Sequence, residues 1–262
     1  MNRFSLALCV LVSTLFTSCT SEPENGLKVA ASSIPHAQML EFIKPDLKSQ
    51  GINLIIVPTE DYNMPNRALA NNEVDANFFQ HLPFLEEQIK QFHYPIESIA
   101  AIEIEPMGIY SKKIHSLSEL QDNATIAIPN DPTNESRALQ LLQAYGIIKL
   151  DKANNLHATI LNIRENTKRI HFIEVDAAML PRTLEDVDAA AINTNFALQA
   201  NLSAQHDALA IEEKDSPYAN ILVVRIGDEN RPEIMSLKDA MTSEKMKQFI
   251  QEKYKGAIIP SF

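Results

Sequence analysis

The sequence contains few of the residues on which common catalytic templates depend. Only 6 of its 262 residues are glycine and only 2 are cysteine. It has no Gly-rich phosphate loop, no G-x-S-x-G nucleophile turn, no H-E-x-x-H helix and no C-x-x-C pair. These absences exclude the common templates for nucleotide binding, serine hydrolysis, zinc proteolysis and thiol redox chemistry. We therefore predict a protein that is not an enzyme, with only a rarer catalytic type left open.

Positive charge is also scarce. The chain has 23 Lys and Arg residues against 34 Asp and Glu residues, a formal net charge of -11. A protein that binds a phosphate backbone needs a basic stripe that displaces condensed counterions, so nucleic acid is excluded as a partner. A chain of this length that is 45% hydrophobic can bury a sizeable core, as one large domain or as two small ones.

The N-terminus has the form of an export signal. Arg3 precedes an apolar run from Ser5 to Phe16, which is too short to span a bilayer comfortably. Thr17-Ser18-Cys19 then resembles a bacterial lipobox, although Phe16 stands where leucine is usual. We expect residues 1–18 to be a signal peptide and Cys19 to become the lipidated first residue of the exported chain.

Two alternatives are a signal peptide that is cleaved near Ser18 without lipidation and a signal anchor that stays uncleaved. Cys9 lies inside the apolar run, so the exported chain would keep one cysteine and could not form an internal disulfide. Lipid attachment is the more economical role for a lone terminal cysteine after an export signal. The polar residues 19–26 would then be a short tether between the lipid in the membrane and the folded body.

The rest of the chain alternates short apolar runs with amphipathic stretches, which predicts a parallel α/β sheet with helices on both faces. The predicted strands are residues 27–31, 52–57, 74–78, 99–104, 125–128, 159–163, 171–175, 189–192 and 221–226. The predicted helices are residues 35–48, 65–72, 82–92, 132–145, 177–184 and 196–200, and a C-terminal helix after a cap at Ser243.

Two α/β blocks meet near Glu105–Gly108 and again near Ser216–Tyr218. Two crossings predict two lobes joined by paired strands, with a ligand cleft between the lobes. We assign residues 27–108 and 227–262 to the first lobe and residues 109–226 to the second.

Three polar segments, residues 61–66, 77–81 and 130–134, follow predicted strands and precede predicted helices. Such junctions lie outside the carboxyl ends of the strands, where α/β proteins build binding sites. Asp131 as N-cap with Pro132 after it is a helix-start signal that needs no functional explanation. Capping does not explain Arg137 one turn further on. It is either a solvated helix residue or, facing the cleft, the partner of a small carboxylate.

The seven histidines are scattered along the chain. A two-lobed metal receptor would draw ligands from both lobes, and His36, His81 and an acid such as Glu105 could in principle meet. The spacing gives no support for that site, since a lone histidine at a strand–helix junction is more often a pocket wall or a surface residue. We therefore expect no metal and no cofactor.

Seven segments carry a distinctive pattern, above all PNDPTN followed by RAL and SPYAN followed by an apolar strand. The segments are IPHAQMLEF (34–42), EDYNMPNRAL (60–69), DANFFQHLPFLEE (75–87), EPMGIYSKKI (105–114), LQDNATIAIPNDPTNESRALQLL (120–142), VDAAAINTNFA (187–197) and KDSPYANILVVR (214–225). In these segments and in their order, the chain resembles the NlpA-type lipoprotein family, the methionine-binding receptors of ABC import systems.

The resemblance implies an α/β fold of the two-lobed periplasmic-binding-protein type (type II-like), with the ligand closed between the lobes. It implies a lipid-anchored receptor that captures L-methionine or a related small zwitterion. The receptor would deliver this ligand to an ABC permease driven by a separate ATPase.

Carried over position by position, the resemblance assigns Tyr62, Phe79 and His81 to the wall of the side-chain pocket. Phe78 is the alternative to Phe79, and the alternation of a strand sends these two side chains to opposite faces. Tyrosine and phenylalanine suit a thioether, because sulfur makes favourable contacts with aromatic rings.

For the charged end of the ligand, the resemblance assigns Arg137 to the α-carboxylate, with Asn134 as a weaker candidate beside it. Asn193 and Asn220 would help to bind the ammonium and the carboxylate. A zwitterion removed from water needs each charge paired, and an Arg fork with Asn oxygens does this. Asn195 stands where many relatives have threonine, which leaves a related amino acid or a short peptide open as the ligand.

Three alternative functions stay open at this point. The same fold could serve a surface-exposed adhesin or antigen without transport, or a metal-binding receptor. A catalytic descendant would need an acid–base pair in the cleft, for which His81 with Glu105 is the candidate.

Overall fold

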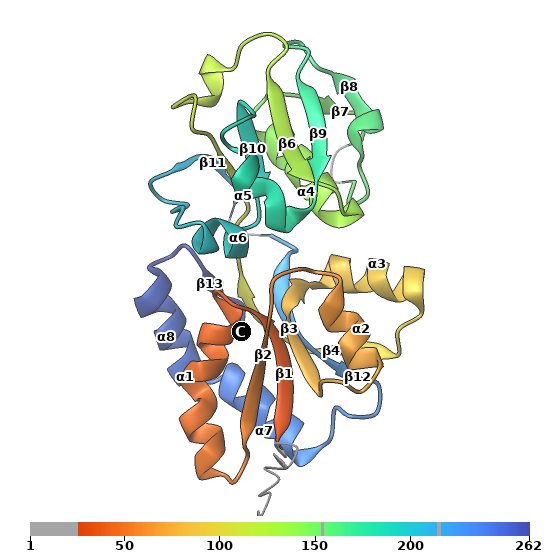
Figure 1. Cartoon of the computed structure of the whole chain (residues 1–262), viewed down its shortest axis with the longest axis vertical. Helices are drawn as coiled ribbons and strands as arrows, with labels where there is room; N and C mark the ends of the chain where they lie inside the picture. Colours follow the sequence, from red (N-terminus) through yellow and green to blue (C-terminus); the bar gives the residue numbers. More distant parts are fainter. Residues whose placement is uncertain (1–25, 153–154, 214–215) are drawn as a thin grey trace, which may run out of the picture.

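A computed structural model describes residues 26–152, 155–213 and 216–262 of the chain. It consists of two lobes, each built on its own β-sheet, stacked along the long axis of the molecule (Figure 1). The predicted two-lobed α/β fold is therefore confirmed. The predicted signal peptide, Cys19 and the tether up to residue 25 lie outside the described residues.

The first lobe contains a six-stranded sheet of order β13-β4-β12-β3-β1-β2. Its strands are β1 (Leu27–Ser32), β2 (Leu54–Thr59), β3 (Ala76–His81), β4 (Ile96–Ile104), β12 (Ala219–Arg225) and β13 (Ile259–Pro260). Its helices are α1 (His36–Ser49), α2 (Met64–Ala70), α3 (Leu82–Phe92), α7 (Pro232–Met241) and α8 (Glu244–Tyr254). Strand β1 runs parallel to β2 and β3, whereas β12 is antiparallel to β3 and β4.

Apolar side chains on both faces of this sheet hold the helices in place. Met39 and Ile43 of α1, with Leu237 of α7, belong to the buried cluster that packs on one face. Leu69 of α2 and Leu85 of α3 belong to a second cluster that packs on the other face. Successive side chains of the central strand β1 alternate between the two clusters, with Val29 and Ala31 in the first and Ala30 in the second, so helices cover both sides, as predicted.

The second lobe contains a five-stranded sheet of order β11-β5-β10-β6-β9. Its strands are β5 (Gly108–Tyr110), β6 (Thr125–Pro129), β9 (His171–Val175), β10 (Ala189–Ile192) and β11 (Ala208–Ile211). Its α-helices are α4 (Pro132–Ala144), α5 (Leu180–Thr183) and α6 (Thr194–Gln199). Short elements at its edges are β7 (Lys149–Leu150), β8 (Ile163–Glu165) and the 3-10 turns at Leu117–Glu119, Ile160–Asn162 and Ala177–Met179.

The structure corrects the predicted boundary of the second lobe. Residues up to 226 were expected there, but β12 pairs with β3 and β4 in the first sheet. The chain therefore returns to the first lobe before Ala219, close to the break noted at Ser216–Tyr218. An apolar run shows that a strand is buried, but it does not say which sheet buries it.

Three further predictions differ from the structure. Both sheets are mixed rather than wholly parallel, because β12 and β5 run antiparallel to their neighbours. The strand predicted at residues 159–163 begins as a 3-10 turn that the Thr159 and Asn162 side chains cap, and the strand starts only at Ile163. The helix predicted at residues 177–184 is a 3-10 turn followed by the four residues of α5.

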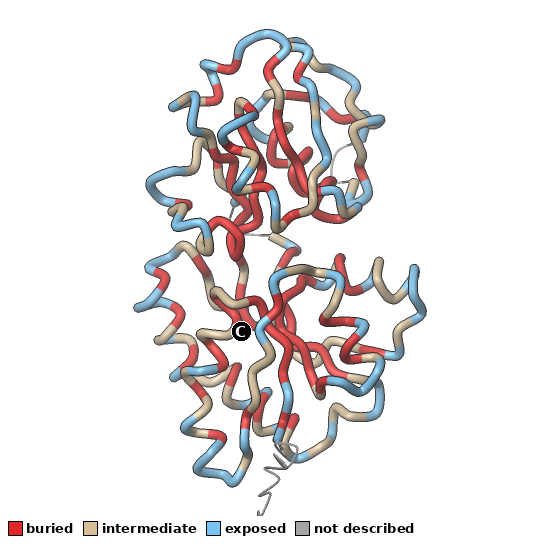
Figure 2. The backbone as a smooth tube through the Cα atoms, viewed as in Figure 1, coloured by how far each residue is buried: buried red, intermediate tan, exposed pale blue. Residues whose placement is uncertain are grey.

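Buried residues run through both sheets (Figure 2), and residues 105–107, which connect the lobes, are buried as well. Polar side chains that are almost fully buried include His81, Asn134 and Asn193, which come from both lobes. Buried polar groups need partners, so their gathering between the lobes marks a built site rather than a core. Among the described helices, none has the length and apolar character needed to traverse a bilayer.

Candidate ligand-binding site

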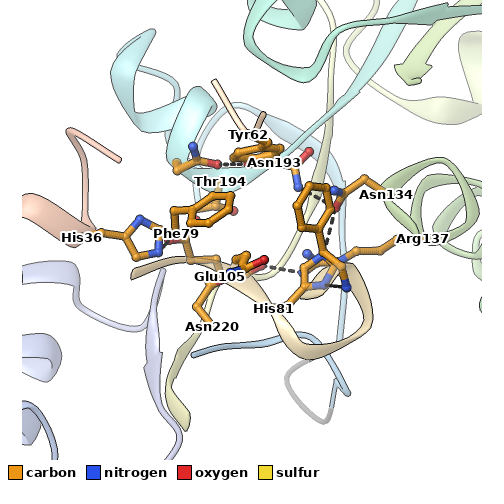
Figure 3. Close-up of a pocket in the computed structure, with 13 residues that line it drawn as sticks. His36, Tyr62, Phe79, His81, Glu105, Asn134, Arg137, Asn193, Thr194 and Asn220 are labelled. Carbon is orange, nitrogen blue, oxygen red and sulfur yellow. Dashed lines mark hydrogen bonds and ion pairs between the residues drawn. The ribbon is translucent and has the colours of Figure 1, made fainter. Parts of the chain in front are cut away.

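A pocket lies between the two lobes, and all seven predicted ligand residues line it (Figure 3). The first lobe contributes side chains from the start of α1, the loop before α2, the end of β3, the start of α3 and β12. The second lobe contributes side chains from α4 and from the start of α6. The lining residues are His36, Tyr62, Phe79, Gln80, His81, Phe84, Glu105, Asn134, Arg137, Asn193, Thr194, Asn195 and Asn220.

The start of α4 places Asn134 in this pocket. Asp131 caps the helix by accepting a hydrogen bond from the Asn134 backbone N–H at 3.0 Å. The same carboxylate also accepts from Asn134 Nδ2, at 3.0 Å to each oxygen. The amide oxygen of Asn134 is therefore left as the end that faces other partners. Asp131 is more than the helix cap that the sequence predicted, because it also orients a pocket side chain.

His81 is a neutral donor in the pocket. The Phe84 backbone N–H donates to His81 Nδ1 at 3.2 Å, so the ring proton is on Nε2 and is donated to Asn134 Oδ1 at 3.1 Å. Burial and the nearby Arg137 charge lower the pKa of His81 from 6.5 to about 3. Both ring nitrogens are occupied, which argues against the metal and acid–base roles considered for His81.

Arg137 is buried, with only 4% of its surface exposed, so it is not the solvated helix residue of the alternative interpretation. Its Nε donates to both Glu212 carboxylate oxygens at 3.1 Å, and its Nη2 donates to the Glu105 carbonyl oxygen at 2.6 Å. The Tyr218 ring centroid lies 4.4 Å from the guanidinium carbon. Burial lowers the pKa of Arg137, but the Glu212 carboxylate outweighs this effect and the pKa is raised. Arg137 therefore remains a cation at the pocket.

The opposite end of the pocket is aromatic. The Tyr62 ring lies 5.9 Å from the Phe79 ring, 5.8 Å from Phe84 and 5.0 Å from Phe196, measured between centroids. Phe79 lines the pocket, whereas Phe78 belongs to the core of the first lobe. The choice of Phe79 over Phe78 as the pocket residue is thus supported by which face of β3 each occupies.

Tyr62 also connects the two lobes. Its hydroxyl donates to Asn195 Oδ1 at 2.6 Å, from the loop before α2 to the start of α6. Burial and the Glu105 charge raise the pKa of Tyr62 well above its usual value, so the hydroxyl keeps its proton. Asn195, which the sequence analysis noted only as a departure from relatives, therefore forms part of the junction between the lobes.

Several buried polar atoms of the lining residues have no hydrogen-bond partner among the described residues. They are Asn193 Oδ1, Glu105 Oε1, Asn195 Nδ2 and both ring nitrogens of His36. Asn220 Nδ2 donates to Glu103 Oε1 at 2.9 Å, which leaves the Asn220 amide oxygen as the free acceptor end. Unmade hydrogen bonds of buried groups are costly, so these atoms point to a polar ligand.

Sequence reasoning missed Phe84 and Thr194 of the pocket wall, and three residues that contact the pocket side chains. Glu212 and Glu103 lie in segments without any motif, and only the fold brings them to Arg137 and Asn220. Tyr218 stands in the SPYAN segment, which was recognised without a role for the tyrosine. Of the predicted metal ligands, His36 and Glu105 do approach each other, but their third neighbour is Glu103 and not His81.

Two α/β lobes that enclose a polar pocket define the class of periplasmic substrate-binding proteins, whose members bind a solute rather than transform it. Within that class, the chain belongs to the NlpA lipoprotein family, whose sequence model matches residues 27–262.

Solved structures and curated relatives agree with this assignment. A nutrient binding protein from Burkholderia cenocepacia bound to methionine superposes with a TM-score of 0.86, is 45% identical and matches over 90% of this chain and 100% of its own. The methionine-binding lipoprotein MetQ of Bacillus subtilis is 39% identical over 97% of this chain and 96% of its own length. The membrane lipoprotein TpN32 of Treponema pallidum is 36% identical over 94% of this chain and 92% of its own length.

Proposed function

We propose that this protein is an exported lipoprotein that captures methionine in the pocket between its lobes and delivers it to an ABC importer. The observation that carries the proposal is the arrangement of the pocket: a buried guanidinium and unpartnered oxygen acceptors at one end, aromatic rings at the other. This arrangement complements an amino acid with an uncharged, polarisable side chain. The names of the relatives specify methionine.

Arg137 is the proposed partner of the ligand carboxylate. Its Nε and Nη2 already bond Glu212 and the Glu105 carbonyl, so Nη1 is the end of the fork left for a ligand among the described contacts. A charge-assisted hydrogen bond in a buried site contributes roughly 1.5–3 kcal/mol. The Glu212 carboxylate keeps the guanidinium in place before a ligand arrives, so little orientation entropy is lost on binding.

Asn193 Oδ1 and the Asn220 amide oxygen are the proposed partners of the ligand ammonium. Asn193 Nδ2 donates to Asn134 Oδ1 at 2.8 Å, and Asn220 Nδ2 donates to Glu103. These hydrogen bonds fix both amides and leave the amide oxygen of each available to a ligand. Each oxygen can accept one N–H of an ammonium group. The Asn134 and Glu103 contacts thus select a cationic amine over an acceptor group at this end.

Tyr62, Phe79 and Phe84 are the proposed contacts of the thioether. A contact between sulfur and the edge of an aromatic ring stabilises a complex by about 0.3–1.5 kcal/mol. A thioether needs no hydrogen-bond partner, so its burial among these rings costs no hydrogen bond. The cluster thereby favours methionine over an amino acid with a polar side chain.

Binding is tested with the chain from residue 20 onward, which contains every described element. The protein is unfolded, dialysed to remove any bound ligand and refolded, and its melting temperature is measured with and without L-methionine. We expect a ligand-dependent rise, because methionine binds only the folded state. The Arg137→Ala variant should bind at least 100-fold more weakly, and Tyr145→Phe, away from the pocket, should bind normally. An unchanged melting temperature at millimolar methionine would contradict the proposal.

The membrane attachment is tested separately. Incorporation of labelled palmitate into the full chain should be lost in Cys19→Ala, and the protein should move from the membrane to the soluble fraction. Labelling that persists in Cys19→Ala would show that the lipid is not attached there.

A further inference from the structure

His36, Glu103 and Glu105 form a compact buried cluster. His36 and Glu105 belong to the wall of the pocket (Figure 3), and Glu103 lies behind it. His36 begins α1, Glu103 is near the end of β4, and Glu105 follows that strand. His36 Nε2 lies 3.3 Å from Glu103 Oε1 and 3.2 Å from Glu105 Oε1. The three side chains are at most 5% exposed. We propose that this cluster binds one divalent transition-metal ion of the Zn²⁺ class.

The direction of the His36 ring distinguishes a metal site from an ordinary ion pair. One oxygen of Glu103 and one oxygen of Glu105 lie near His36 Nε2, yet neither has hydrogen-bond geometry with it. The Nε2 axis therefore passes beside the two oxygens instead of pointing at either one. A histidine that shares a metal ion with two carboxylates has this arrangement, because all three ligand atoms point at a common centre.

The spacing of the ligand atoms supports the same conclusion. Tetrahedral zinc has Zn–N distances of about 2.0–2.1 Å and Zn–O distances of about 2.0–2.2 Å, which put two ligand atoms about 3.3–3.5 Å apart. The two distances from His36 Nε2 fall at or just below this range, at 3.3 and 3.2 Å. Imidazole with two carboxylates is a donor set that suits zinc and its neighbours in the first transition series.

The charges of the cluster also call for a cation. Glu103 Oε1 accepts from the neutral Asn220 amide, and Glu105 accepts from the Asn195 backbone N–H. Arg137 donates to the backbone carbonyl of Glu105 and not to its carboxylate. The two carboxyl groups also bond each other. When both are ionised and no cation is bonded, such a buried pair is costly, and a divalent ion bound in place of a shared proton would neutralise both.

The surroundings hold the three ligands and place two of them at the pocket. The Phe78 ring packs edge-on against His36 with 4.4 Å between centroids, and Asn220 holds the Glu103 oxygen that would bind the metal. His36 and Glu105 line the pocket, so we expect an ion to reach the cluster from that side. Zinc sites with three protein ligands take water or a small ligand in the fourth position.

The test uses untagged protein from residue 20 onward, refolded in EDTA and dialysed against metal-free buffer. Titration with ZnCl₂ in a calorimeter should show one tight site per chain. Glu103→Gln and His36→Gln should each weaken that site at least tenfold, whereas His115→Gln, an exposed histidine, should leave it unchanged. Titration with Co²⁺ should give the intense visible absorption of a tetrahedral site. Circular dichroism shows whether each variant is folded.

Equal Zn²⁺ binding by wild type and both cluster variants would overturn the proposal, as would weak binding with many ions per chain. Failure of Zn²⁺ to bind, together with weaker methionine binding by Glu105→Gln, would also overturn it and would show that the cluster binds the ligand ammonium instead. Methionine binding measured in EDTA is independent of the metal. The metal site and the proposed function therefore fail on different measurements.

Discussion

Asn134 joins three neighbours through a single amide group. Its Nδ2 donates to Asp131, and its Oδ1 accepts hydrogen bonds from His81 and Asn193. Because both ends of the amide are used, its orientation is determined, and so is the proton position on His81. A side chain that looks like a helix-start residue in the sequence thus coordinates the polar half of the pocket.

The neutral state of His81 predicts a pH dependence of stability. Its pKa is about 3 in the folded protein and 6.5 in the unfolded chain, so below pH 6.5 the unfolded chain binds a proton that the folded protein does not. Stability is therefore lost as the pH falls from 6.5 toward 3, by up to about 1.4 kcal/mol per pH unit. Urea unfolding of wild type and His81→Gln at pH 7 and pH 5 measures this loss.

The comparison with His81→Gln is needed because burial raises the pKa values of Glu105 and Asp131. Those carboxyls bind protons more readily in the folded protein, so they stabilise it as the pH falls. The variant keeps them and lacks only the histidine. We expect the advantage of wild type over the variant to shrink by about 2 kcal/mol between pH 7 and pH 5. A constant difference would mean that His81 titrates equally in both states.

The Tyr62 hydroxyl predicts a measurable contribution to ligand affinity. Tyr62→Phe keeps the ring contacts and removes the hydrogen bond to Asn195 that joins the lobes. A net loss of about 1 kcal/mol corresponds to roughly fivefold weaker methionine binding in a calorimetric titration. Tyr145→Phe removes a hydroxyl bonded to the Ile211 carbonyl within the second lobe, and its affinity should match wild type. Equal affinities of all three proteins would contradict the prediction.

At the scale of elements, the caps of α4 and α8 allow a matched experiment. Asp131 and Ser243 each accept a hydrogen bond from the backbone N–H three residues later. Replacement of either by alanine should lower the free energy of unfolding by about 1 kcal/mol. Only Asp131→Ala should also weaken methionine binding, because Asn134 loses its anchor. Equal affinity in the two variants would show that Asp131 is a helix cap and no more.

Elements with strong local signals were predicted well, and elements that depend on their neighbours were not. Helix α3 matches its predicted bounds, because Pro83 near its start and its apolar spacing act within the segment. The two-residue strand β13 was missed, because its strand geometry arises from pairing with β4 and not from its own residues. Helix α7 was also missed, although Pro232 and the spacing of Ile234, Leu237 and Met241 were available as signals.

At the scale of the whole molecule, Arg137 contacts both connections between the lobes. It bonds the Glu105 carbonyl in the first connection, and Glu212 and Tyr218 in the second. A ligand carboxylate bound to Arg137 would therefore act on the residues of both connections between the lobes. The hydrogen bonds Tyr62–Asn195 and His81–Asn134 bridge the lobes directly, and an open form must break both.

This arrangement predicts that methionine closes the molecule. Small-angle X-ray scattering of ligand-stripped protein should show a smaller radius of gyration after L-methionine is added. The free energy of unfolding should rise by about 2.7 kcal/mol when the free ligand is at 100 times its Kd. Arg137→Ala, with a Kd at least 100-fold higher, should gain at most about 0.4 kcal/mol at the same methionine concentration and show at most about half of the compaction. Stabilisation without compaction would mean that the lobes are already closed before binding.

The sequence alone determined the types of residue at the pocket, the helix starts and most strands, because caps, proline positions and apolar spacing act over a few neighbouring residues. It also predicted the two-lobed fold and the seven pocket residues through the order of the recognised segments. Tertiary structure alone decided that β12 lies inside the first sheet, between β3 and β4, and that Glu212 neutralises Arg137. The same is true of the meeting of His36 with Glu103 and Glu105. These are contacts between residues far apart in the chain, and only the packed fold determines which buried charges become neighbours.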